Sequence, residues 1–286
     1  DDTGLHRFAS TSTAVYESIA FGVWNILGMS VAGAQNHLTC SRNLPFIQIV
    51  CSTDGIPQIT YSTDGGLTSS LISVSVNKVV MSGDALTQSG VAINSSPLGS
   101  ANPLYISETR WGLDGPVKEL KRMANREWTS LGMSYDGKNQ VACVNGGDLY
   151  ISFDFGQTWS VRQTNIQPVM SDMGLTGDFQ TIISSGREIY RSDNIGQTWS
   201  VIPFVNSWRD IASSHNNIGN AQIAIIPNYG QIYVSTSGGA SWNLRGPAPL
   251  GSEYNWRAIG VSGNGLVMSA AVGNGDLYVS TDTGVT

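Results

Sequence analysis

The sequence contains carboxylate side chains that could act together as a catalytic pair. Cleavage of a glycosidic bond uses two of them at catalytic separation, one acting as an acid and the other as a base or nucleophile. The 286 residues include six glutamates, of which Glu127, Glu188 and Glu253 fall in segments expected to be loops. Asp210, which follows Arg209 directly, could pair with Glu127 or Glu253. Asp210, Glu127 and Glu253 are therefore the weak catalytic candidates of the sequence.

Basic side chains point to binding rather than to catalysis. Arg209 and Arg257 each follow a tryptophan at a corresponding place, so they could face the same side of the fold. Their simpler interpretation, which we prefer, is an arginine bonded to neighbouring backbone carbonyls rather than a clamp on a substrate. In segment 244–254, Arg245 and Tyr254 could form a wall for a sugar or a peptide.

A second basic group lies in segment 112–127, the longest insertion in the chain, and just before it. Five of the fifteen basic residues gather there within 17 positions: Arg110, Lys118, Lys121, Arg122 and Arg126. They could meet an acidic partner, whereas a solvated insertion is the simpler interpretation. Residues 117–125 are expected to form either a short helix or a long strand.

The histidines and cysteines indicate neither a metal site nor a cofactor. The three histidines lack the spacing of metal ligands. The three cysteines, Cys40, Cys51 and Cys143, form no CxxC motif, and an odd number cannot pair fully within one chain. Buried free thiols are therefore favoured. A bridge between Cys40 and Cys51 stays open, because the two could lie on neighbouring strands.

A repeat organises the whole chain and must position these candidates. Residues 152–159 and 192–199 both fit the pattern S-x-D-x-G-x-T-W, with Asn194 in place of the aspartate in the second copy. Weaker and degenerate copies share the leading serine, which falls at Ser18, Ser62, Ser107, Ser152, Ser192, Ser235 and Ser280. Successive serines are 44, 45, 45, 40, 43 and 45 residues apart. This regular period predicts an array of one structural unit.

Each copy of the pattern is expected to close a tight hairpin. The aspartate can accept hydrogen bonds from backbone N–H groups two and three residues on and from the threonine hydroxyl, and the glycine allows a turn that a Cβ would penalise. The tryptophan is expected to fold back as core. The residues expected in this structural role are Asp64, Asp154, Asn194, Asp282, Trp159, Trp199 and Trp242.

Four short strands in each repeat follow from apolar runs between turn signals. The first strand starts at an aromatic residue such as Trp128, Trp208 or Trp256, or in the equivalent segments 37–41 and 168–173. The second is a run such as 140–144 or 222–226, the third ends at the leading serine, and the fourth begins at the tryptophan of the pattern. Four strands in a period of 40–45 residues predict an all-β protein, a β-propeller of four-stranded blades that spans residues 1–286 as a single domain.

The number of blades depends on how the two ends are interpreted. Seven copies favour seven blades, in which the first blade lacks its first strand and the last copy stops within its turn. A short C-terminal piece is then expected to be absent from this sequence. The alternative is a six-bladed ring, in which the strand at Trp24 completes the last blade and residues 1–20 form an arm.

Charge and hydropathy exclude several kinds of partner. A net charge of −6 argues against a general nucleic-acid binder. No run approaches the ~18 apolar residues of a membrane helix. The N-terminus has no charged region followed by an apolar stretch, so the sequence contains no signal peptide, while a removed one stays open. The compartment is undetermined, with an extracellular or virion surface favoured.

The pattern and its period resemble those of the Asp-box (BNR-repeat) β-propeller superfamily over essentially the whole chain. This superfamily includes sialidases, sortilin-type receptors, photosystem II assembly propellers, xyloglucan-degrading enzymes and propeller lectins. The resemblance therefore implies a fold rather than one function. Sialidases use three arginines, an early one within Arg-Ile-Pro, a tyrosine nucleophile paired with a glutamate, and an aspartate acid/base. This chain has no Arg-Ile-Pro and no convincing triad.

We therefore expect a non-catalytic recognition or structural propeller rather than an enzyme. It would bind a protein partner or a glycan through the face made by the loops between fourth and first strands and between second and third strands. It could be a subunit of a larger assembly, such as a virion or a cell-surface complex. Unequal loop lengths favour one asymmetric site over a repeated lectin site. The alternatives are a glycoside hydrolase, sialidase-like or other, with a central carboxylate pair, and an assembly factor.

Overall fold

The computed structural model describes the strands and most of the tight turns of the chain. The described residues are 6–10, 15–19, 23, 25–27, 35–41, 48–52, 59–65, 67–72, 78–83, 88–91, 104–107, 121–122, 126, 128–144, 148–163, 172–176, 179, 182–185, 188–203, 208–215, 223–227, 230–246, 254–273 and 275–285. Over these residues the protein is all-β. None of them belongs to a helix long and apolar enough to cross a membrane. The chain divides into two compact units, one with Leu5–Val144 and Ile151–Ser160, the other with Asn145–Tyr150 and Val161–Thr286.

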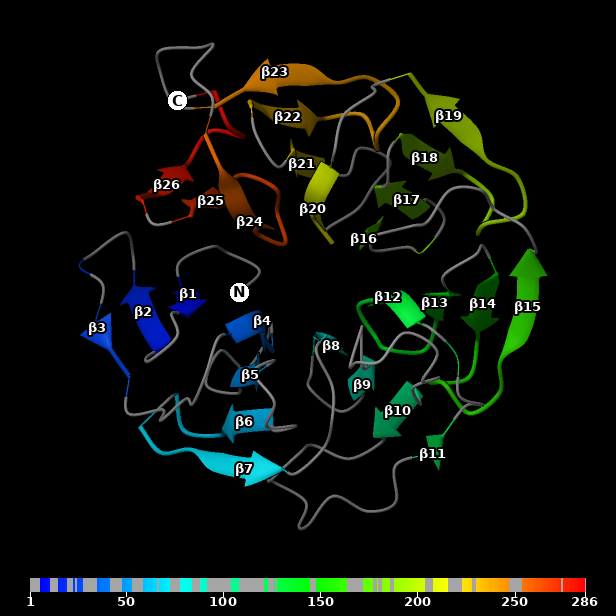
Figure 1. Cartoon of the computed structure of the whole chain (residues 1–286), viewed down its shortest axis with the longest axis horizontal. Coiled ribbons are helices and arrows are strands. Elements are labelled where there is room, and N and C mark those ends of the chain that lie inside the picture. Colours follow the sequence, from blue (N-terminus) through cyan, green and yellow to red (C-terminus); the bar gives the residue numbers. More distant parts are fainter. Residues whose placement is uncertain are drawn as a thin grey trace. The chain divides into compact units, whose positions relative to one another are not determined.

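The first unit is built from sheets whose strands follow one another in chain order (Figure 1). One sheet has three strands: β1 (His6–Ser10), β2 (Val15–Ile19) and β3 (Asn25–Ile26). The next has four: β4 (Gln35–Cys40), β5 (Gln48–Ser52), β6 (Ile59–Ser62) and β7 (Ser70–Ile72). A further four-stranded sheet contains β8 (Lys78–Met81), β9 (Gln88–Val91), β10 (Leu104–Ser107) and β11 (Lys121–Arg122).

The later sheets repeat this order. One contains β12 (Trp128–Met133), β13 (Gln140–Val144), β14 (Leu149–Ser152) and β15 (Ser160–Gln163). In the second unit, one sheet has β16 (Asp172–Leu175), β17 (Ile182–Ser185), β18 (Ile189–Ser192) and β19 (Ser200–Ile202). Another has β20 (Trp208–Ser213), β21 (Ile223–Pro227), β22 (Ile232–Ser235) and β23 (Asn243–Arg245). The last has three strands: β24 (Trp256–Val261), β25 (Met268–Val272) and β26 (Leu277–Ser280).

Many strand boundaries match the sequence prediction closely, and the following differ. The fourth strands β15, β19 and β23 begin one residue after the tryptophan expected to start them, because that tryptophan still belongs to the turn. Strand β16 begins at Asp172, later than the segment 168–173 predicted. Of residues 117–125, the described part is the two-residue strand β11, paired with β10. Strands β1 and β2 pair over His6–Ser10 and Val15–Ile19, so these residues form part of a sheet.

The backbone register also bears on the cysteines. Cys40 of β4 lies opposite Gln48, and Cys51 of β5 lies opposite His37. The two cysteines are thus on neighbouring strands but three positions out of register, roughly 10 Å apart along the strand at about 3.4 Å per residue. A disulfide spans at most about 7 Å between Cα atoms, so this register opposes the bridge. Cys143 of β13 is buried and forms no disulfide.

Tryptophans of two kinds contribute differently to the core. The tryptophans that open first strands are at most 5% exposed, and they are Trp128, Trp208 and Trp256. Those of the S-x-D-x-G-x-T-W turns are only half-buried, which corrects the expectation that they are core: Trp159, Trp199 and Trp242. The indole N–H of Trp159 donates to the Gly156 carbonyl at 2.9 Å, and that of Trp242 to Gly239 at 3.0 Å. Each ring is therefore held against its own turn.

A register shift recurs near the start of the first strands. It lies between Gln35 and His37, between Trp128 and Ser130, between Trp208 and Asp210, and between Trp256 and Ala258. A β-bulge of this kind places one extra residue on the strand and redirects its side chain. In β20 and β24 the extra residue is an arginine, Arg209 or Arg257, so the fold singles out two of the residues predicted to bind.

Candidate functional site

The turn between β14 and β15 is held by Asp154. The Thr158 amide donates to Asp154 Oδ1 at 2.8 Å, the Thr158 hydroxyl to Oδ2 at 2.5 Å, and the Ser152 hydroxyl to Oδ1 at 2.8 Å. The main backbone donor to Asp154 is thus the amide four residues on, that of Thr158, and the amide of Gln157 contributes less. The sequence prediction instead expected the amides two and three residues on. The Thr158 hydroxyl is the largest cause of the lowered pKa of Asp154, since these bonds stabilise the carboxylate.

Other copies of this turn keep the geometry while the residue type changes. Asp64 accepts the same set of bonds, and its threonine hydroxyl is the largest cause that lowers its pKa to about 2. Asn194 accepts the amide four residues on at 2.9 Å and donates its own Nδ2–H to the threonine hydroxyl at 2.8 Å. Ser237 accepts the equivalent amide at 3.0 Å, and Asp282 accepts an amide three residues on at 3.0 Å. A charge is therefore not required at this position, and the turn is structural.

A second turn, between the first and second strands of a sheet, contacts the turn between the third and fourth strands. Asp136 accepts a bond from the Lys138 amide at 3.0 Å. The Lys138 carbonyl in turn accepts from the Phe155 amide at 2.9 Å, and the Leu266 carbonyl accepts from the Thr283 amide at 3.0 Å. Phe155 and Thr283 both have positive φ, 59° and 61°, and this backbone conformation points their amides toward the two carbonyls. This contact could not be predicted from residue types, because neither Phe155 nor Thr283 is a glycine or asparagine.

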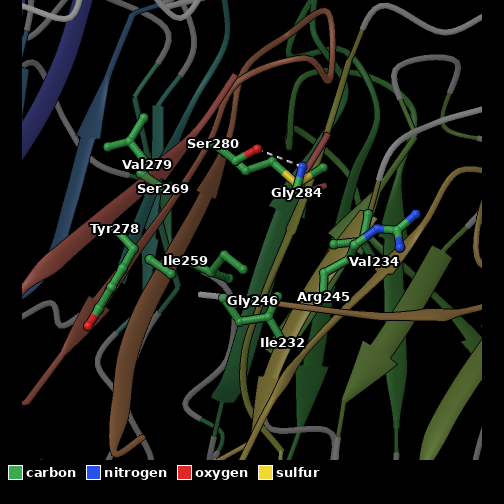
Figure 2. A pocket seen from close by; sticks show the side chains of 12 residues that line it. Ile232, Val234, Arg245, Gly246, Ile259, Ser269, Tyr278, Val279, Ser280 and Gly284 are labelled. Atoms are coloured by element: carbon green, nitrogen blue, oxygen red, sulfur yellow. Dashed lines mark hydrogen bonds between the residues drawn. The ribbon is translucent and has the colours of Figure 1, made fainter. Parts of the chain in front are cut away.

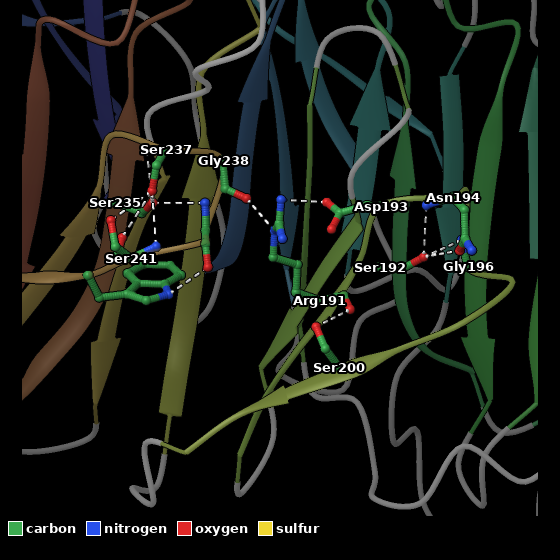
Figure 3. Close-up of polar contacts among 12 residues, drawn as sticks. Arg191, Ser192, Asp193, Asn194, Gly196, Ser200, Ser235, Ser237, Gly238 and Ser241 are labelled. Atoms are coloured by element: carbon green, nitrogen blue, oxygen red, sulfur yellow. Dashed lines mark hydrogen bonds and ion pairs between the residues drawn. The ribbon is translucent and has the colours of Figure 1, made fainter.

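Two arginines connect neighbouring sheets at these turns. Arg162 Nε donates to the Ile195 carbonyl at 3.0 Å. Arg191 Nε donates to the Gly238 carbonyl at 2.8 Å (Figure 3). Both carbonyls belong to the third residue after a leading serine. Arg191 also forms an ion pair with Asp193 at 2.5 Å. At the turn end of these sheets, both arginines thus bond to the backbone of the next sheet.

The bulged arginines lie at the opposite end of the sheets, the loop end. Arg209 Nε donates to the backbone carbonyl of Arg257 at 3.4 Å, the type of bond that our preferred interpretation describes. The side chain of Arg257 is exposed. It lies over Gly273, where a Cβ would be 2.5 Å from Arg257 Nε. Of the two, Arg209 thus has a contact with the next strand, and Arg257 presents its guanidinium to solvent.

Asp210, the carboxylate that could act as a catalyst, is bonded to two strands at once. Its Oδ1 accepts from the Ile211 amide at 2.9 Å, and its Oδ2 accepts from the Ile259 amide, also at 2.9 Å. Ile211 follows Asp210 in β20, and Ile259 lies in β24 of the next sheet. The side chain therefore braces the first strands of two sheets, and each of its oxygens already has an amide donor.

An aromatic group stands beside the bulge of β24. The ring centroids of Tyr254 and Trp256 are 5.1 Å apart, and those of Tyr278 lie 5.6 Å from Tyr254 and 5.8 Å from Trp256. The Trp256 indole N–H donates to the Gly230 carbonyl at 2.9 Å. A hydrogen bond with Tyr254 is the largest cause that raises the pKa of Tyr278, with partial burial next. Tyr254 is thus part of a packed cluster at the loop end of the last sheet.

A tyrosine–glutamate pair that the sequence analysis did not single out occurs at the start of β18. The Tyr190 hydroxyl donates to Glu188 Oε2 at 2.5 Å. Burial is the main cause that raises the pKa of Tyr190 to about 12, and the hydrogen bond and charge of Glu188 add to it. The phenol therefore stays protonated at neutral pH, with the Glu188 carboxylate as the acceptor of its hydrogen bond. In two other repeats an acidic residue, Asp148 or Asp276, also stands two positions before a third-strand tyrosine. This recurrence is a sequence signal that could have predicted the pair.

The remaining candidates are placed only in part. Glu127, Glu253 and Lys118 lie outside the described residues. Lys121 and Arg122 form β11, opposite Ile106 and Tyr105. Two further arginines are half-buried: Arg126 and Arg245. Among the described residues, no three His, Cys, Asp or Glu side chains are grouped so that they could hold a metal ion.

No known family profile matches the sequence, and no curated protein matches it as a relative. Solved structures do match, and they are β-propellers. The Myceliophteria thermophila Cps50 (Swd1) β-propeller domain has a TM-score of 0.72 at 13% identity over 98% of this chain and 94% of that one. A hydrazine synthase chain of Kuenenia stuttgartiensis has a TM-score of 0.73 at 11% identity over 99% and 94%.

The GH74 enzyme of Niastella koreensis has a TM-score of 0.55 at 15% identity, and the match covers all of this chain but 55% of that enzyme. This chain therefore spans little more than half of that protein. At these identities the likeness concerns the fold alone. It places the chain among β-propeller folds.

Proposed function

We propose that the chain is a β-propeller of the Asp-box type with seven blades. The described residues support this with seven sheets in chain order, each tied to one copy of the repeat. The hydrogen bonds of the turns at Asp64, Asp154 and Asn194 support the Asp-box assignment, because the serine, the Asp or Asn and the threonine bond in the same way in each. On this proposal residues 1–286 act as one domain.

The function that this geometry supports best is non-catalytic recognition. The observation that carries it is the state of Asp210, whose two oxygens accept backbone amides at 2.9 Å. Both oxygens accept backbone amides of the scaffold, an arrangement that favours a bracing role over that of a general acid or nucleophile.

The binding surface is the loop end of the sheets, where Arg257 is exposed and directly follows Trp256 of the aromatic cluster. An exposed guanidinium suits a ligand with an anionic or hydroxyl-rich group, which a glycan or a protein partner can offer. The propeller would serve as a subunit that presents this face within a larger assembly.

The test combines a glycan array with turnover of fluorogenic glycosides. We expect no turnover, and we expect binding on the array that Arg257→Ala weakens about tenfold, with Lys138→Ala at the turn end as the matched control. Turnover of any glycoside that is lost in Asp210→Asn, while the melting temperature is unchanged, would show an enzyme and overturn the proposal.

A further inference from the structure

An apolar pocket and a strand with an open edge lie together in the last part of the second unit. The pocket is lined by β22, β23, β24, β25 and β26, and its empty volume is about 480 Å³, including space open to solvent (Figure 2). In the described residues β26 pairs with β25 alone. The repeat predicts a turn tryptophan and a fourth strand after Thr286, which would fill the pocket and pair with β26. Neither feature therefore indicates a partner.

The outer strand of the second sheet, β7, lies far from that end of the sequence and also has an open edge. Within the described residues it pairs with β6 alone. Leu71, the middle residue of β7, is 60% exposed, and Leu67 in the preceding turn is 75% exposed. Val161 and Val201, which stand at the same place in β15 and β19, are 48% and 52% exposed. The edge of β7 is thus open and strongly apolar.

A serine stands beside this edge where other repeats have tryptophan. Ser69 ends the turn that begins at Ser62, whereas Trp159 and Trp242 end the equivalent turns. Those two indoles donate to carbonyls of their own turns at 2.9 and 3.0 Å, so each ring lies against the start of its outer strand. A serine side chain is far smaller than an indole and covers less of the start of β7.

No charged side chain protects the edge of β7. Residues 65–77 contain neither a charged residue nor a proline. Charged residues and prolines on an edge strand oppose its pairing with another chain. The outer strands of the other four-stranded sheets each carry a basic residue or are followed directly by proline: Lys121, Arg122, Arg162, Pro203 and Arg245. Among these sheets, β7 is therefore the edge that is suited to pairing.

The absence of charge favours a second copy of the same chain as the partner. The net charge of −6 makes two copies repel each other, so they can approach best where neither carries charge. A twofold axis at Leu71 pairs two β7 strands antiparallel, with Leu71 opposite the same residue of the other copy and Ser70 opposite Ile72. Opposite residues in such a pair have Cβ atoms about 4.5–5.5 Å apart, so the two leucines cover each other. At β11 the same symmetry would oppose basic residues of one copy to those of the other.

We propose that the chain forms a symmetric dimer through antiparallel pairing of two β7 strands. The pairing joins two four-stranded sheets into one sheet of eight strands. The open backbone edge supplies the hydrogen bonds, and Leu71 supplies the apolar contact at the axis. This surface is the outer edge of the second sheet and not the loop end, so the proposal stands independently of the proposed recognition role.

The test is sedimentation velocity of the 286-residue protein over a range of concentrations, with hydrogen exchange to locate the contact. We expect a reversible dimer and slower exchange at Ser70–Ile72 as the concentration rises. Leu71→Lys places two ammonium groups opposite each other and is expected to weaken the dimer about tenfold or more. Val201→Lys, at the equivalent exposed position of β19, is the matched control and is expected to keep it.

A mixture of charge variants separates the contact from an effect on folding. Leu71→Glu alone is expected to be as monomeric as Leu71→Lys, whereas an equimolar mixture of the two is expected to recover the dimer, because opposite charges then face each other. A monomer at every concentration, a dimer that Leu71→Lys leaves intact, or a mixture that recovers no dimer each overturns the proposal. So does a dimer that is lost in Leu277→Lys, on the open edge of β26, because the last sheet then forms the contact.

Discussion

Replacing Asp210 separates a structural carboxylate from a catalytic one. The side chain accepts the amides of Ile211 and Ile259, both at 2.9 Å, and so joins the first strands of two sheets. Asp210→Asn keeps one carbonyl oxygen and turns an N–H₂ group toward the other amide, so at least one charge-assisted bond is lost. Asp210→Ala removes both acceptors and leaves the half-buried Ile259 amide without its acceptor.

The expected loss follows from these bonds. A hydrogen bond to a charged group contributes about 1.5–3 kcal/mol, so we expect Asp210→Asn to lower the free energy of unfolding by about that amount. Asp210→Ala is expected to cost about 2–4 kcal/mol, since the exposed part of the site lets water replace some of the loss. For a chain of this size, about 1 kcal/mol shifts the melting temperature by roughly 2–4 °C.

The assay is thermal and urea unfolding followed by circular dichroism, with Asp276→Asn as the control. Asp276 is exposed beside β26, so its replacement is expected to change stability by less than about 0.5 kcal/mol. The reasoning is refuted if Asp210→Asn melts together with the parent and the control. A stable Asp210→Asn variant would mean that the two amides find other acceptors and that the carboxylate serves something other than the scaffold.

Three further predictions address the turns and the buried tyrosine. The pKa of Asp154 is lowered in the fold, so the carboxylate stabilises the fold above its usual pKa near 3.8, and this stabilisation is lost as the pH falls below that value. Asp154→Asn should therefore reduce the pH dependence of the melting temperature between pH 5 and 2. The variant should still fold, because Asn194 makes the equivalent turn. Gly83→Ala should cost about 1–3 kcal/mol in urea unfolding, since the added Cβ would lie 2.5 Å from the Tyr135 ring, and an unchanged stability would contradict the packing. The pKa of Tyr190 is raised to about 12, so absorbance at 295 nm should show one phenol that stays protonated at pH 11 until unfolding, and stability should fall as the pH rises above 10.

The parts of the fold that the sequence predicted well are those with local causes. The S-x-D-x-G-x-T-W turn closes within eight residues, so its serine, aspartate and threonine are readable in order, and the bonds at Asp154 follow from side-chain chemistry alone. Strands β13 and β14 coincide with the predicted runs for the same reason. The half-burial of Trp159 was missed, because whether a ring reaches the core depends on the neighbouring sheet and not on its own turn.

The contacts between sheets were missed because their partners are 33 to 49 residues apart in sequence. Arg162 binds a backbone carbonyl, and Asp210 binds a backbone amide, and such partners carry no sequence signal since every residue has them. The bulge at Arg209 is likewise invisible, because it is a property of strand pairing. The sequence therefore presents Asp210 as a catalytic candidate, whereas the structure shows that its oxygens accept backbone amides.

The same braces explain why two arginines at equivalent positions have different roles. Arg209 reaches the carbonyl of Arg257 because another first strand follows in the next sheet. Arg257 instead lies over Gly273 in its own sheet, where the absence of a Cβ makes room for it, and its guanidinium stays exposed. Two copies of the repeat thus differ where the arginine of one copy bonds to the neighbouring sheet and the arginine of the next copy does not. That asymmetry leaves Arg257 exposed at the loop end, and the proposed recognition role can be tested at this position.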